Sequence, residues 1–291
     1  MGLDLHDRSI FDLVNERSKA LEDELKADIV FYNGRIHPAY FRTFRDFIEE
    51  VRALSDKKWD AVAFFIRTGG GSAETAERMV SVLRKHYKSV YYVVPDFAMS
   101  AGTILCMSGD KIYMDYASSL GPIDPQIPAP DTGDYVPALG YLDKVNEITA
   151  KGELAPADVV LLKSLDLAKL ALFEQARDLS IDLLKKWLVE YKFKDWKEHR
   201  TDPKKKGKPV TRAEKQQRAE EIAKALANHR RWRSHGRNLD TIKLSELRIE
   251  IDDYSDNEPL RRLIREYNDP LTGFIDRMDM SFFLHNRHAG P

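Results

Sequence analysis

Short β-branched and aromatic runs alternate with longer amphipathic segments over roughly the first 115 residues. Apolar residues recur every three to four positions in the longer segments, as in helices with one buried face, and the short runs have strand length. We expect strands at 27–31, 61–66 and 89–94 and helices at 38–54, 72–87 and 101–107. Strands and helices that alternate with short connections indicate a parallel sheet wound in one sense, and therefore an α/β fold.

The segments around this pattern are mainly helical. Residues 8–26 carry apolar positions at helical spacing among many charges, so we expect an outlying amphipathic helix that packs on a neighbouring subunit. Thr211 and Glu214 have the spacing of a capping box. The remaining expectations are an exposed loop at 127–134, helices at 138–151, 156–191, 211–231 and from 259 onward, and a last strand at 244–251. No repeat of fixed period is present.

These elements predict four segments. They are an N-terminal amphipathic helical arm (1–26), an α/β core (27–200), a basic linker (201–210) and a C-terminal helical extension (211–291). The lysines at 204–208 are typical of a solvated linker rather than of a nucleic-acid site.

Composition mainly excludes classes of partner, disulfide bonding and membrane insertion. The chain has 291 residues, of which 43% are hydrophobic and 32% charged, and its net charge of −1 gives no reason to expect nucleic acid or an anionic membrane as a partner. Cys106 is the one cysteine, which excludes an intramolecular disulfide, suits a reducing cytoplasm and predicts a buried core position. The first residues lack the features of a signal peptide, and no apolar run approaches about 18 residues. We expect a cytoplasmic protein without metal or cofactor.

Two strand-to-helix junctions carry the candidate chemistry. At the first, Gly69, Gly70 and Gly71 leave N–H groups bare at a helix N-terminus, where anionic oxygen is favoured. At the second, Ser100 lies on a sharp elbow between a buried strand and a buried helix, beside Ala101. Neighbouring parallel strands place both junctions at one end of the sheet. That arrangement is typical of acyl transfer by a nucleophile with an oxyanion hole.

Four motifs in this order carry a family resemblance. They are Gly-Gly after a strand, Met99-Ser100-Ala101-Gly102-Thr103, Asp110-Lys111-Ile112-Tyr113-Met114 and Leu120-Gly121-Pro122-Ile123-Asp124-Pro125-Gln126. Over residues 60–127 the chain resembles the Clp-type and signal-peptide-peptidase-A-type serine peptidases, and most of all the serine dehydrogenase proteinase family. The resemblance implies a Clp/crotonase-like ββα spiral, hydrolysis of peptide bonds in peptides or unfolded segments, and a homo-oligomer.

The resemblance also implies an oxyanion hole. One N–H would come from the second glycine of the pair, Gly71 (or Gly70), and one from Ala101, the residue after the serine. The family usually has proline before the pair, where this chain has Gly69, so either glycine remains a candidate donor. The resemblance assigns Asp110 a structural role.

The general base has two candidate arrangements, because no histidine occurs from 87 to 198 and the Clp-type triad order is therefore absent. The first is a Ser–Lys dyad, for which Lys144 has a polar setting and Lys169 lies among leucines that would lower its pKa. The second follows the Ser, Asp, His order of the resembled family. It would use Ser100, then Asp124 or Asp166, then His235, which lies beyond a flexible linker. We favour Lys169.

Two classes of function follow. The first is a cytoplasmic serine peptidase, and the second is a catalytically weak or inactive protein of the same fold that acts as an oligomeric scaffold. The crotonase-like fold also hosts acyl-CoA chemistry, but that chemistry needs no serine at this elbow. Homo-oligomerisation is also indicated by the amphipathic N-terminal helix and the aromatic C-terminal tail, which have more apolar residues than lone surface segments need.

Overall fold

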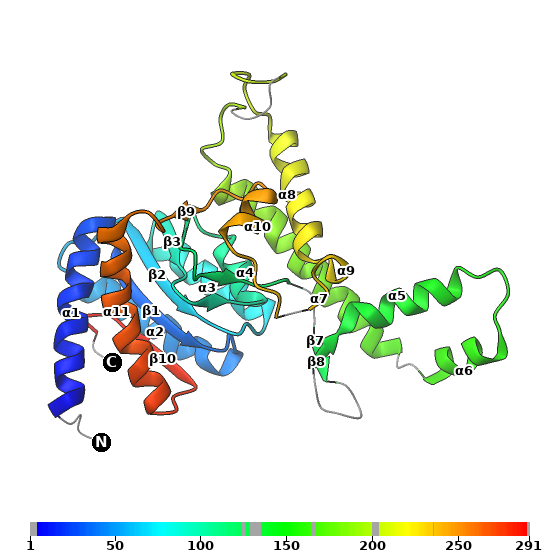
Figure 1. The fold of residues 1–291 in the computed structure, drawn as a ribbon, viewed down its shortest axis with the longest axis horizontal. Coiled ribbons are helices and arrows are strands. Elements are labelled where there is room, and N and C mark those ends of the chain that lie inside the picture. Colours follow the sequence, from blue (N-terminus) through cyan, green and yellow to red (C-terminus); the bar gives the residue numbers. More distant parts are fainter. Residues whose placement is uncertain are drawn as a thin grey trace.

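A six-stranded sheet forms the centre of the molecule in the computed structural model (Figure 1), which describes residues 5–123, 126–128, 135–164, 167–199, 204–234 and 236–289. The strand order is β10-β1-β2-β3-β5-β9, and all neighbours run parallel except β10, which is antiparallel to β1. These strands are β1 (Asp28–Gly34), β2 (Ala61–Arg67), β3 (Ser89–Val93), β5 (Lys111–Met114), β9 (Asp252–Asp253) and β10 (Phe282–His285). The predicted parallel sheet is confirmed.

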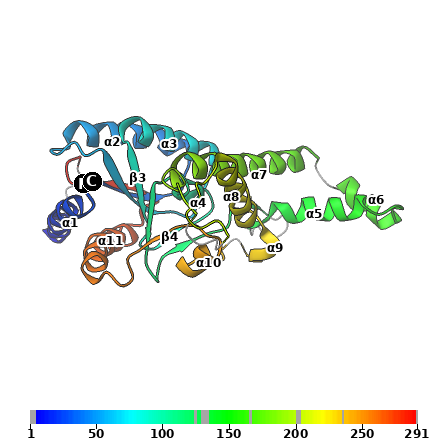
Figure 2. The same ribbon diagram turned by 90° about the horizontal axis from the view of Figure 1, so that it is seen from above.

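Helices cover both faces of this sheet, with α2 and α3 on one side and α1 and α11 on the other (Figure 2). The helices are α1 (Leu5–Leu25), α2 (Phe41–Leu54), α3 (Ala73–His86), α4 (Ala101–Cys106), α5 (Ala138–Thr149), α6 (Pro156–Ser164), α7 (Leu167–Trp187), α8 (Arg212–Leu226), α9 (His229–Trp232), α10 (Thr241–Glu246) and α11 (Glu258–Arg277). A 3₁₀ turn (Pro38–Tyr40) precedes α2, and a π-helical turn (Leu188–Lys192) ends α7. The predicted capping box of Thr211 and Glu214 starts α8.

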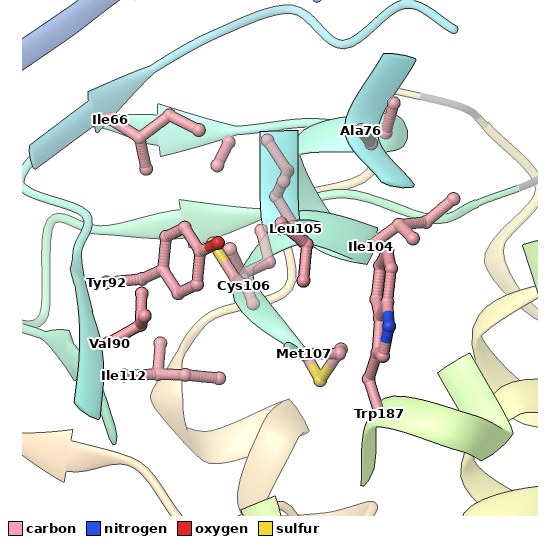
Figure 3. Packing of buried hydrophobic residues seen from close by; sticks show 14 of the residues in the cluster. Ile66, Ala76, Val90, Tyr92, Ile104, Leu105, Cys106, Met107, Ile112 and Trp187 are labelled. Atoms are coloured by element: carbon pink, nitrogen blue, oxygen red, sulfur yellow. The ribbon is translucent and has the colours of Figure 1, made fainter. Parts of the chain in front are cut away.

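Strand residues alternate between two hydrophobic cores. In β1, Val30 and Tyr32 belong to the core under α2 and α3, whereas Ile29 and Phe31 belong to the core under α1 and α11. Successive strand side chains point to opposite faces, so a parallel strand that is covered on both sides is apolar throughout. Cys106 is fully buried in the first core (Figure 3), as predicted.

A second row of short β contacts runs beside the main sheet. It forms because the chain makes a further β-bridge or short strand after each of β1, β2, β3 and β5. Its pieces are the bridges Ile36–Gly71 and Thr68–Ala98, the two-stranded pair β4 (Phe97–Ala98) with β6 (Ser119–Leu120), and the bridge Leu120–Leu239. Two strands and a helix per unit, repeated along the sheet, give the predicted ββα spiral.

The helices α5, α6 and the first part of α7 project from the body of the molecule (Figures 1 and 2). The C-terminal end of α7 returns to the core, where Trp187 belongs to the same cluster as Ile104 of α4 (Figure 3). In α8, Ile222 and Leu226 join this cluster. Packing therefore crosses the segment boundary that the sequence placed before residue 211. None of the described helices combines the length and apolar composition of a membrane span.

Three sequence expectations need correction. The N-terminal helix is present but not outlying, because α1 packs along α11 and buries Phe11 and Val14 in the chain's own core. Residues 244–251 do not form a strand: Asp240 accepts the Lys243 N–H and caps α10 instead. The loop expected at 127–134 begins with β7 (Gln126–Pro128), which pairs antiparallel with β8 (Tyr135–Pro137).

The aromatic tail is also used within the chain. Phe282 and Phe283 lie in β10, where Phe283 packs into the α1–α11 core. Phe11, Val14 and Phe283 of the terminal segments are thus buried without a second subunit, whereas Leu5 is 81% exposed.

Candidate active site

The turn at Ser100 is sharp and strained. Its φ of 52° and ψ of −117° lie in a region that L-residues rarely adopt, at a cost of about 1–3 kcal/mol. The Met99 N–H donates to the Thr68 carbonyl (2.9 Å) and the Gly102 N–H to the Met99 carbonyl (2.8 Å), so hydrogen bonds hold the turn from both sides. Ser100 is half-buried, and its hydroxyl makes no hydrogen bond among the residues that the structure describes.

Small residues and one threonine shape this elbow. A Cβ on Gly102 would lie 2.4 Å from Thr68 Cγ2, so only glycine lets α4 approach the end of β2 this closely. The buried Thr103 hydroxyl lies 2.9 Å from the Ala98 carbonyl and 2.8 Å from the Gly121 carbonyl, and it accepts the Gly121 N–H at 3.0 Å. Thr103 therefore ties the serine turn to the segment that follows β6.

The glycine loop lies directly against the serine turn. A Cβ on Gly70 would come within 2.7 Å of both Ser100 Cβ and the Met99 carbonyl, and Gly70 has a φ of +101°. Gly71 has a φ of +150°, and a Cβ there would meet the Ile36 carbonyl at 2.0 Å. Neither position accepts a side chain. By contrast, a Cβ on Gly69 meets nothing within 4 Å.

The backbone donors of the two junctions differ in availability. The Gly70 N–H donates to Thr68 Oγ1 at 3.0 Å. The N–H groups of Gly71 and Ala101 make no hydrogen bond within the described part of the chain. Ala101 begins α4, where the first N–H groups have no intrahelical acceptor. Two open donors, one directly after Ser100 and one directly after the glycine that packs on Ser100, suit the binding of a negatively charged oxygen during acyl transfer.

A sequence family described as ClpP-like SDH-type serine proteinase matches residues 36–217, which include both junctions. The chain belongs to this family. The resemblance seen in the sequence is confirmed, and with it the fold class.

Two proteins of Methanocaldococcus jannaschii are similar to this family member. The uncharacterized protein MJ1495 is 30% identical over 216 residues, which are 74% of this chain and 60% of that protein. The uncharacterized protein MJ0137 is 34% identical over 163 residues, which are 54% of this chain and 52% of that protein. The chain thus spans between half and three-fifths of the length of these relatives.

Two solved structures are also similar, both of the 1510-N membrane-bound stomatin-specific protease. A serine-to-alanine variant matches with a TM-score of 0.44 and 14% identity, covering 80% of this chain and 81% of that one. A lysine-to-alanine variant in complex with a substrate peptide matches with a TM-score of 0.36 and 18% identity, covering 56% and 57%.

Of the candidate base residues, the structure describes the side chain of Lys144 alone. Lys144 lies on α5 with 54% of its side chain exposed, and it pairs with Glu147 at 3.2 Å. The backbone of Lys169 lies in α7, but its side chain is outside the described part of the structure. Asp124, Asp166 and His235 are also outside the described residues.

Leu239, four residues after His235, is connected to the serine turn through β6 and β4. Leu239 pairs with Leu120 through two hydrogen bonds of 3.1 and 2.8 Å, and β6 in turn pairs with β4, which leads into Ser100. In addition, the Ile123 N–H donates to the Leu226 carbonyl at 3.2 Å. The linker therefore does not carry this segment away from the site.

The structural role expected of Asp110 is confirmed. Its carboxylate, only 7% exposed, accepts the Val90 N–H and an Arg84 N–H at 2.7 Å each, and it also pairs with Lys194. Burial alone would raise the pKa of Asp110, but these donors outweigh it and lower the pKa. The network joins α3, β3 and the segment after α7 at the end of the sheet opposite Ser100.

Sequence reasoning missed two threonines at the junctions. Thr68 follows β2 and Thr103 lies in α4, and both are almost completely buried. A buried hydroxyl needs hydrogen-bond partners, so threonines in these apolar contexts were the available signal.

Proposed function

We propose that this protein is a serine peptidase that hydrolyses peptide bonds in peptides or unfolded protein segments. The observation that carries the proposal is the strained Ser100 turn packed against a glycine loop with two open N–H donors nearby. An extended substrate segment would pair with backbone edges at this end of the sheet. No cofactor is required.

In the proposed reaction, a base takes the Ser100 proton while Oγ forms a bond to the carbonyl carbon of the substrate. The carbonyl oxygen becomes an oxyanion that accepts hydrogen bonds from the N–H groups of Gly71 and Ala101. The tetrahedral intermediate collapses, the C–N bond breaks, and the protonated base gives its proton to the leaving amine. Water then hydrolyses the acyl-enzyme by the same sequence of steps.

Of the two candidate arrangements for the general base, we favour the Ser–Lys dyad with Lys169. It lies in a leucine-rich stretch of the first part of α7, which projects from the body, so coverage by a neighbouring subunit would bury its amine, lower its pKa and keep it neutral. Lys144 is the less suitable lysine because it is exposed and paired with Glu147. The alternative is His235 with Asp124 or Asp166. It gains support from the return of the following residues to β6.

Peptide turnover by a matched set of variants tests the proposal. Ser100→Ala should abolish hydrolysis without loss of folding. Lys169→Met should lower activity by about 10² or more, whereas Lys144→Met, the matched lysine control, should leave it within about threefold. Loss of activity in His235→Gln together with full activity in Lys169→Met would instead assign the histidine base. A folded wild-type protein without turnover would favour the scaffold alternative.

We also propose that the protein assembles as a homo-oligomer in the cytoplasm. Large apolar side chains are exposed on the projecting helices, with Val160 of α6 69% exposed and Leu172 of α7 60% exposed. Such residues, in a segment that extends away from its own core, fit an interface with a second copy. The buried free thiol of Cys106 fits a reducing compartment.

A further inference from the structure

Thr68 lies where the glycine loop meets the serine turn, and it contacts both. Its N–H donates to the Phe97 carbonyl (3.1 Å), and its carbonyl accepts the Met99 N–H (2.9 Å), which forms the bridge to Ala98. Its methyl group packs against the first turn of α4 at Gly102. The same buried residue thus connects the end of β2 with the residues on both sides of Ser100.

The hydroxyl of Thr68 occupies one N–H of the glycine loop. Oγ1 accepts the Gly70 N–H at 3.0 Å, and the Gly70 carbonyl accepts the Ile36 N–H at 2.9 Å. Both backbone polar groups of Gly70 are therefore satisfied inside the chain. Gly71 follows in an exposed position, flanked by the 2.9 Å bond from the Ser72 N–H to the Ile36 carbonyl. Its own N–H is without a partner among the described residues.

The peptide between Gly69 and Gly70, which carries the Gly70 N–H, is open on its Gly69 side. A Cβ on Gly69 would meet nothing within 4 Å, so the residue before Gly70 is loosely surrounded. Glycine at a φ of +101° also has wide conformational freedom. Without Thr68 Oγ1, the buried Gly70 N–H would have to turn toward another acceptor. The Gly71 N–H shares its peptide plane with the Gly70 carbonyl, which accepts the Ile36 N–H at 2.9 Å, so a rotation at Gly70 would strain that bond and tilt the Gly71 N–H.

We propose that Thr68 is a positioning residue of the oxyanion hole. Its hydroxyl occupies the Gly70 N–H, so the Gly71 N–H is the one presented to substrate together with that of Ala101. The catalytic consequence rests on the proposed peptidase function, whereas the occupancy of the Gly70 N–H does not.

Residue-resolved hydrogen exchange measures the occupancy directly. In the wild type, the Gly70 amide should exchange at least about tenfold more slowly than the Gly71 amide. Thr68→Val keeps the branched shape and methyl group but lacks the acceptor, so it should accelerate exchange at Gly70 by about tenfold or more, and Thr68→Ser should not. Thr68→Ala repeats the test should the valine variant fail to fold. The control is Thr75→Val, because the hydroxyl of this buried threonine makes no hydrogen bond within the described part of the chain, and its N–H donates to Ser72 Oγ at 3.0 Å.

Steady-state kinetics tests whether Thr68 contributes to catalysis by positioning the oxyanion hole. Thr68→Val should lower kcat by about tenfold or more with KM within about twofold, and Thr68→Ser should restore kcat. Equal wild-type exchange at Gly70 and Gly71, or unchanged Gly70 exchange in Thr68→Val, would overturn the Thr68 assignment whatever the activity. A wild-type protein that hydrolyses nothing, yet shows the expected exchange, would refute the peptidase proposal and support the occupancy of Gly70.

Discussion

Substituting the three consecutive glycines one at a time separates loop architecture from catalysis. Gly71→Ala places a Cβ 2.0 Å from the Ile36 carbonyl at a φ of +150°, so the bonds of 2.9 Å on either side of Ile36 must stretch or break. Backbone strain of about 1–3 kcal/mol and two hydrogen bonds of about 1 kcal/mol each predict a loss of about 3–5 kcal/mol in the free energy of unfolding.

Gly70→Ala should act on the nucleophile instead. Its Cβ would stand 2.7 Å from Ser100 Cβ and from the Met99 carbonyl, so the serine turn must shift by several tenths of an ångström. We expect destabilisation of about 1–3 kcal/mol, and labelling by a fluorophosphonate about 10²-fold slower than in the wild type. Gly69→Ala is the matched control, because its Cβ meets nothing within 4 Å and its unfolding free energy should stay within about 1 kcal/mol of wild type.

Urea denaturation followed by circular dichroism gives the unfolding free energies, and labelling rates give the effect on the nucleophile. The reasoning is refuted if Gly70→Ala labels within about threefold of the wild-type rate, since the observed packing leaves the serine turn no room. It also fails if Gly69→Ala costs as much stability as Gly71→Ala.

Three further predictions concern stability and assembly. Asp110→Asn should lower the free energy of unfolding by about 3 kcal/mol at pH 7. Because the folded-state pKa of Asp110 is lowered, this stabilisation is present above the unfolded pKa and is lost as pH falls through the folded pKa. Equal losses in urea titrations at pH 7 and pH 3 would contradict this prediction. Burial lowers the pKa of His285 to about 4, so the unfolded state binds the extra proton between about pH 6.5 and 4. Wild-type stability should therefore fall by about 3 kcal/mol over that range relative to His285→Gln, and parallel pH profiles would exclude this. Light scattering should give a mass above the 33.5 kDa of one chain, with a shift toward that value in Val160→Glu, and a monomeric wild type would refute the oligomer.

The central elements were predictable because two independent signals agree there. The strand at 61–66 is continuously apolar and the following helix is amphipathic. A sheet covered by helices on both faces buries the whole strand and the apolar face of the helix. The segment at 244–251 shows the opposite case. Its apolar residues alternate like a strand, but Asp240 caps a helix just before it, and the local cap prevails.

Contacts between distant segments were not predictable from local pattern. The apolar face of α1 fits a subunit interface or an intramolecular partner equally well, and only the position of α11 decides between them. The same holds for the active site. The order of motifs placed Ser100 and the glycines at one end of the sheet. The hydrogen bond from the Gly70 N–H to Thr68, however, depends on loop geometry that spacing does not specify.

The most direct test of the peptidase account is to locate the covalent adduct. Purified protein is treated with a fluorophosphonate, digested and mapped by mass spectrometry, with Ser100→Ala and Ser108→Ala treated in parallel. Ser108 is a suitable control because its hydroxyl is buried and bonded to the Leu105 carbonyl at 2.7 Å. The account predicts one phosphonylated residue, Ser100, in the wild type and in Ser108→Ala, and no adduct in a folded Ser100→Ala. An adduct that persists in Ser100→Ala, or a folded wild type that never reacts, would contradict it.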